Sequence, residues 1–157
     1  MTKEITKGKK GFTIIEVVLV LAIAGLIFLM VFVALPALQR SQRDTQRRQD
    51  YADLASAISN YTTNNNGKLP SPSSGKLDPK QYINSEGTDP KGTTYTIIVQ
   101  KGSVTTAPTE GQVYVATEAE CKMDDTSGYA QPSAVTNKRA FAVYGYLETG
   151  TYCQANQ

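Results

Sequence analysis

Glu16 is the side chain with the clearest chemical potential, because it is a single carboxylate just inside a long apolar run. The run from Val17 to Leu38 has 22 residues and carries no charge. As a helix it would be roughly 33 Å long, which is enough to cross the hydrocarbon core of a membrane. A carboxylate near the start of such a helix is costly unless it is paired or lies at the interface. Glu16 therefore either reaches the lipid headgroups or is kept for a cationic partner.

Phe12 lies four residues before Glu16, about one helical turn away. If the chain is cut after Gly11, Phe12 gains a positively charged amine. The amine of a neighbouring chain could then pair with Glu16 inside a helix bundle, where few other cations are available. An ordinary secretory signal fits less well, since its apolar region has only about 7–15 residues and is followed by a cleavage site of small residues.

The residues before the apolar run are basic. Lys3, Lys7, Lys9 and Lys10 stand against Glu4, which gives this segment a net charge of +3. Lysines that flank one end of a membrane span hold that end in the cytoplasm. The sequence therefore predicts a single-pass protein of the cytoplasmic membrane, with the N-terminus inside and the bulk of the chain outside.

The segment Lys10-Gly11-Phe12-Thr13-Ile14-Ile15-Glu16 resembles the N-terminus of the type IV pilins and the related pseudopilins. Their pattern is a basic leader that ends in glycine, then phenylalanine, three further residues, and a glutamate that opens a hydrophobic helix. The resemblance is close over about the first 40 residues. It implies that Lys10, Gly11 and Phe12 are recognised by a membrane prepilin peptidase, and that Phe12 is then N-methylated.

Gly25 and Pro36 are the two helix-weakening residues within the apolar run, and both are tolerated in membrane helices. The family usually has a glycine here and a proline eight residues later, whereas Pro36 follows Gly25 by eleven. The resemblance implies that these residues, with Glu16, serve assembly, and that part of the helix changes as the filament forms. The alternative is a simple kink at Pro36.

The helix is predicted to continue beyond the membrane. Residues 39–50 are very polar and contain no Gly or Pro, so we expect a solvated helix with pairs such as Arg40–Asp44. Apolar residues then recur at helical spacing, and this face should pack on something. They are Tyr51, Leu54, Ala55, Ile58 and Tyr61. The run Asn64 to Gly67 should end the helix.

Strand signals fill the C-terminal half, after a Pro- and Gly-rich connection at 65–92 with one short helical turn expected near Pro79 to Ile83. The expected strands are Thr93–Gln100, Gln112–Thr117, Lys138–Glu148 and, more weakly, Thr151–Gln154. Short turns favour an antiparallel sheet with one face on the helix. The fold class is therefore α+β, a long N-terminal helix packed against a small antiparallel sheet.

Four segments follow from this layout: a cleaved leader (1–11), a transmembrane or filament-core helix (12–38), its amphipathic continuation (39–64) and a globular head domain (65–157).

Cys121 and Cys153 both lie in the exported part, which favours a disulfide, and the resemblance supports it. Two reduced thiols are the alternative. Asp124 and Asp125 could ligate calcium, although solvated turns use the same residues.

Composition points away from catalysis. There is no histidine, which removes the commonest general base and the commonest transition-metal ligand. There is no Gly-rich phosphate loop, no nucleophile elbow and no EF-hand spacing, so no cofactor or metal is expected. Without residues 1–11 the chain has 12 basic and 13 acidic residues, a balance that argues against a dedicated nucleic-acid surface.

The sequence thus predicts a structural protein, a prepilin whose mature form polymerises into an extracellular pilus or an envelope-spanning filament. Its expected partners are other copies of itself, the prepilin peptidase, the pilus assembly machinery and, before assembly, the membrane. A pseudopilin of a type II secretion or DNA-uptake machine shares all these residues. A monomeric membrane-anchored binding domain is the alternative from another class, and it predicts an uncut N-terminus.

Overall fold

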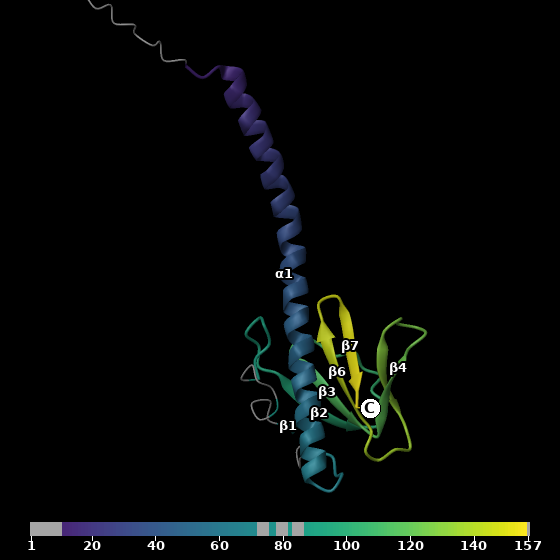
Figure 1. Ribbon diagram of the computed structural model, residues 1–157. Coiled ribbons are helices and arrows are strands. Elements are labelled where there is room, and N and C mark those ends of the chain that lie inside the picture. The colour runs from purple at the N-terminus through teal and green to yellow at the C-terminus, as the bar shows by residue number, and fades with distance from the viewer. Residues whose placement is uncertain (1–10, 72–75, 78–81, 83–86, 157) are drawn as a thin grey trace, which may run out of the picture. The chain divides into compact units, whose positions relative to one another are not determined.

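The computed structural model describes residues 11–71, 76–77, 82 and 87–156 (Figure 1). The chain divides into two units, Met1–Gln39 and Arg40–Gln157, which are described separately. The second is called the head unit below. Lys10 and the basic residues before it lie outside the described residues, as does most of the expected helical turn between Pro79 and Ile83.

Helix α1, Ile14–Asn64, supplies residues to both units. Pro36 lies within it. The helix ends where the sequence predicts: Gly67 adopts a left-handed φ of 81°, and its N–H donates to the Thr62 carbonyl at 2.8 Å. This geometry satisfies a carbonyl that the helix itself leaves free.

The described part of the head unit contains seven strands: β1 Lys76–Leu77, β2 Thr96–Lys101, β3 Gln112–Thr117, β4 Ala119–Met123, β5 Ala130–Ala134, β6 Phe141–Leu147 and β7 Gly150–Ala155. Five of them form one sheet in the order β1-β2-β3-β6-β7, and β4 pairs with β5 in a separate hairpin. The fold is α+β, as predicted. The sheet is mixed rather than purely antiparallel, because β2 and β3 run parallel. Residues 102–111 provide the crossover that a parallel pair needs.

One face of the sheet packs against α1 (Figure 1). The core combines Tyr51, Leu54, Ala55 and Ile58 of α1 with Ile97, Val113, Val115, Phe141, Val143 and Leu147 of the sheet. This confirms the amphipathic helix face, except that Tyr61 is 38% exposed and lies outside the core. Gly145 permits the close approach, since a Cβ there would lie 2.3 Å from the Tyr51 ring.

The opposite face of the sheet is covered by the β4–β5 hairpin, which the sequence did not predict. A second cluster of buried residues lies there: Val104, Ala116, Ala119, Ala142 and Tyr144. The Cys121–Cys153 disulfide joins β4 to β7 beside this cluster. Strand β6 is therefore covered on both faces, whereas one buried face was expected.

Candidate functional site

Glu16 and Thr13 form a closed set of hydrogen bonds at the start of α1. The Thr13 N–H and hydroxyl both donate to Glu16 Oε2, at 2.8 and 2.7 Å. The Glu16 N–H points back to the Thr13 hydroxyl oxygen at 3.4 Å. This reciprocal arrangement is a capping box, which satisfies amide groups that the first helical turn leaves free. Thr13 was not singled out from the sequence, but the spacing Thr-x-x-Glu before an apolar run is the signal that would have found it.

Only one oxygen of the Glu16 carboxylate is used in this box. All three contacts involve Oε2 or the backbone, and Oε1 has no donor among the described residues. Phe12, one turn away, is 90% exposed. The carboxylate can therefore cap its own helix and still accept a hydrogen bond from a cation on another molecule.

The first unit presents apolar side chains in every direction. All large hydrophobic residues between Phe12 and Leu38 are exposed, from 47% at Leu35 to 90% at Phe12. The helix contains a segment with a mean hydropathy of 3.2, none of it buried, so it is long and apolar enough to cross a membrane. The position of a Cβ on Gly25 has no atom within 4 Å. Helices that are apolar all round are stable only in a membrane or among other helices.

The polar stretch of α1 that follows is not the solvated helix that was expected. The Arg47 side chain is fully buried and binds Asp89 through two hydrogen bonds of 2.6 and 3.1 Å. It also contacts Asp44 at 3.1 Å and Glu148 at 3.2 Å. Arg43 holds Glu148 in a second two-pronged pair, at 2.6 and 2.9 Å. Arg43, Asp44, Arg47, Asp89 and Glu148 are together called the ion-pair cluster below.

Asp44 fastens α1 to the turn between β6 and β7. Its carboxylate accepts hydrogen bonds from the Glu148 N–H at 2.8 Å, the Thr149 N–H at 3.1 Å and the Thr149 hydroxyl at 2.8 Å. Burial alone would raise the pKa of Asp44, but these donors and Arg47 outweigh it, and the pKa lies below its ordinary value. Asp44 therefore has a structural role, since its hydrogen bonds join α1 to the turn at the end of the sheet.

Within the ion-pair cluster, the opposite charges favour the ionised forms of one another. Hydrogen bonding to Arg43 is the main reason that the pKa of Glu148 falls to about 2. Burial opposes the charge of Arg47, yet its bonds to Asp89 keep its pKa above the ordinary value. Sequence reasoning missed this cluster because Asp89 and Glu148 lie 42 and 101 residues beyond Arg47.

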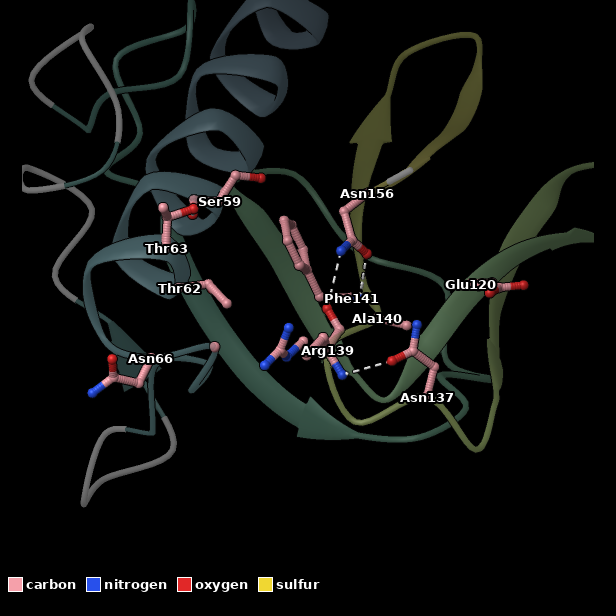
Figure 2. Close-up of a pocket in the computed structure, with 11 residues that line it drawn as sticks. Ser59, Thr62, Thr63, Asn66, Glu120, Asn137, Arg139, Ala140, Phe141 and Asn156 are labelled. Atoms are coloured by element: carbon pink, nitrogen blue, oxygen red, sulfur yellow. Dashed lines mark hydrogen bonds between the residues drawn. The ribbon is translucent and has the colours of Figure 1, made fainter.

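A groove of about 760 Å³ lies at the other end of the head unit, between the last turns of α1 and the segment that enters β6 (Figure 2). Hydroxyls and amides line it, and Arg139 lies between the two walls. The aspartates considered for calcium lie elsewhere, in the β4–β5 turn, where Asp124 accepts a hydrogen bond from the Ser127 N–H at 2.8 Å. No group of three or more potential metal ligands occurs within the described part of the chain.

The candidate residues thus fall into two places. Gly11, Phe12, Glu16, Gly25 and Pro36 lie in the first unit, and Cys121 and Cys153 are joined in the head unit. No curated protein and no solved structure gives a significant match to the chain. Residues 6–32 match the family described as the prokaryotic N-terminal methylation motif. The chain therefore carries, on an exposed apolar helix, the N-terminal signature of type IV pilins and pseudopilins.

Proposed function

We propose that this chain is the structural subunit of a type IV pilus filament. It is made as a prepilin with its N-terminus in the cytoplasm, cleaved after Gly11 by a membrane prepilin peptidase and methylated at Phe12. It then polymerises through α1, with the head unit outside. One observation carries the proposal: the methylation motif stands at the start of a helix whose apolar side chains are exposed on every side.

Such a helix needs an apolar environment both before and after assembly. Before assembly the membrane provides it, and in a filament the helices of other copies do. Lipid tails are as apolar as leucine, so packing and polar contacts must favour the bundle over the membrane. Gly25 offers a point of close approach, because the space around it is open. Glu16 offers the polar contact.

Cleavage after Gly11 creates the cation that Glu16 lacks. The new Phe12 amine of one copy would donate to Glu16 Oε1 of a neighbour, the oxygen that the capping box leaves free. In an apolar bundle an unpaired charge is costly, so the pair would also fix the axial position of each incoming subunit. Gly25 and Pro36 would let the helix adjust to its neighbours.

The test is the N-terminal mass of protein in sheared surface material. We expect a chain that begins with methylated Phe12. Gly11→Val should remain as full-length precursor in the membrane, because the valine side chain at the cleavage position should block the peptidase. Gly8→Val is the matched control, and it should be processed normally. Filaments that contain mature Gly11→Val protein would refute the assignment.

A second arm separates the filament from a simple anchor. Glu16→Val should be inserted and cleaved but should not enter filaments, whereas an anchor would insert as well or better. Because Glu16→Val also removes the helix cap, Thr13→Val is the control: it breaks the capping box and keeps the carboxylate. Glu16→Asp should be partly defective. Wild-type amounts of Glu16→Val in sheared filaments would show that the carboxylate does not direct assembly.

The same material distinguishes the alternatives. Abundant surface filaments indicate a pilin, and a short periplasmic fibre with the same processed N-terminus indicates a pseudopilin. An uncut N-terminus without any polymer indicates a monomeric membrane-anchored domain.

A further inference from the structure

The groove at the end of α1 contains a cation, Arg139, that has no ion-pair partner among the described residues. The Arg139 side chain lies against Gly67, so closely that a Cβ on Gly67 would be 2.6 Å from Arg139 Nε. Figure 2 shows the Arg139 side chain between α1 and the sheet. Within the described ranges its guanidinium makes no ion pair, unlike Arg43 and Arg47. Gly67 thus leaves room for a charged group that no acidic side chain of the described residues neutralises.

Asn137 provides a second donor near Arg139. Asn156 is fully engaged, since its amide donates to the Arg139 carbonyl at 3.0 Å and its oxygen accepts from the Phe141 N–H at 2.6 Å. Asn137 uses only its oxygen, which accepts from the Arg139 N–H at 3.0 Å, so its NH₂ group is available. The Arg139 guanidinium and the Asn137 NH₂ group can therefore donate to an acceptor on another molecule, and a carboxylate suits a guanidinium best.

Charge at this end of the head unit favours the same occupant. Lys138 is exposed next to Arg139, and Lys68 is exposed next to Gly67 in an adjoining groove. Glu120 is the one carboxylate that lines the Arg139 groove among the described residues. Lys101 and Glu118, nearby, neutralise each other at 2.9 Å. The surface keeps an excess of positive charge.

The β4–β5 turn has the complementary chemistry. Asp125 is exposed, and Asp124 shapes the turn through its bond to Ser127. Met123 and Tyr129 flank the two aspartates and are 70% and 44% exposed. They are two of the three large apolar side chains that are exposed within the described part of the head unit. An acidic turn with exposed apolar residues on both sides is suited to docking rather than to solvation alone.

These two surfaces lie at opposite ends of the head unit. The Tyr129 hydroxyl donates to the Thr149 carbonyl at 3.2 Å, and Thr149 is held by Asp44 near the start of the unit. The groove lies at the last turns of α1. Asp44 and Asn64 are 20 residues apart on α1, which corresponds to roughly 30 Å. Figure 1 shows the β4–β5 turn away from the end of α1. One molecule cannot join its own two surfaces, but two molecules can.

We propose that the head units bind one another end to end, with the Asp124–Asp125 turn of one copy seated in the Arg139 groove of the next. The inference rests on the proposed function and names a second contact for the same polymer, separate from α1. The two surfaces are different, so the contact is heterologous and repeats without closing, as a filament requires. Asp125 pairs with Arg139, and Lys138 adds attraction from the rim.

Charge exchange in the full-length protein tests the pairing. Arg139→Glu and Asp125→Arg should each lower the protein in sheared filaments at least about tenfold, since close interfacial charge pairs have couplings of that size or larger. The double variant should recover to within about threefold of wild type. Lys122→Glu is the matched control, because Lys122 is an exposed cation on the same hairpin outside the turn, and it should assemble normally. The Cys121–Cys153 disulfide, mapped in each variant, reports a folded head unit.

Cross-linking tests the contact itself. Asp125→Cys combined with Lys138→Cys should give a ladder of covalent oligomers in oxidised filaments, at multiples of the mass of this chain. The pair Thr105→Cys and Lys138→Cys should not, because Thr105 is exposed on another loop. Normal filaments without a ladder, or a cross-link to a species of another mass, would overturn the end-to-end contact and leave the proposed function intact. Processed wild-type protein that forms no filament would overturn both.

Discussion

Arg47→Met is the sharpest test of how the head unit is held together. The substitution keeps much of the side-chain volume and removes the charge. It leaves Asp89, whose side chain is fully buried, without its two hydrogen bonds from the guanidinium. Asp44 and Glu148 each lose one contact but keep other partners. Asp89 therefore bears most of the loss.

Breaking a buried pair by removing one partner costs about 3–5 kcal/mol, because the remaining charge stays buried. The equilibrium constant for unfolding should rise by roughly a hundred- to several-thousand-fold. At about 4–8 °C per kcal/mol for a small domain, the midpoint of thermal unfolding should fall by more than about 10 °C. The measurement is thermal and urea unfolding of the full chain in detergent, followed by circular dichroism.

Arg40→Met is the matched control, since Arg40 is exposed on the same helix and should lose less than about 0.5 kcal/mol. Adding Asp89→Asn to Arg47→Met should recover part of the stability by removing the isolated charge. A loss no larger for Arg47→Met than for Arg40→Met would refute the reasoning that Arg47 holds α1 to the sheet.

Three further outcomes are expected for the head unit. Its stability should fall as the pH drops from about 4.5 towards 2, because folding lowers the pKa of Glu148 from 4.5 to about 2. The ionised Glu148 stabilises the fold fully only above its unfolded-state pKa, and this stabilisation is lost as the pH falls through the folded-state pKa. Unfolding midpoints that do not change across this range would contradict the prediction. Gly145→Ala should lower the free energy of unfolding by about 1–3 kcal/mol, since the added methyl group would overlap the Tyr51 ring. Gly25→Ala is the control: the space around Gly25 is open, so the unfolding midpoint should not change. Replacing both cysteines of the disulfide by alanine should lower stability by about 3–4 kcal/mol, as expected for a crosslink that spans 32 residues; equal urea midpoints with and without reductant would sink this estimate.

Local patterns in the sequence were enough to predict α1, its end and the main strands. The helix ends at Asn64 as expected, because the Asn-Gly stop is a property of adjacent residues. Strand β3 runs from Gln112 to Thr117, the range that its β-branched residues predict. The N-terminal motif was equally local: its spacing can be read within seven residues.

The missed features depend on residues that are far apart in sequence. The β4–β5 hairpin was not recognised because its strands, Ala-Glu-Cys-Lys-Met and Ala-Gln-Pro-Ser-Ala, lack the β-branched and aromatic residues that mark strands. They are held by packing on the sheet and by the disulfide. The burial of Arg47 could not be predicted from its neighbouring residues either, because charged side chains on a helix usually face water. The position of the Arg139 guanidinium beside Gly67, with no ion-pair partner among the described residues, could likewise be seen only in the folded structure.

The ion-pair cluster also sets the order in which the head unit can fold. Arg47 is synthesised early, but its partners Asp89 and Glu148 follow 42 and 101 residues later. Cys153, which closes the disulfide, comes later still. Contacts of such long sequence separation form slowly and only after the connecting chain is available. A nascent chain therefore cannot complete the cover over the buried face of α1 until Phe141, Val143 and Leu147 of β6 have been made.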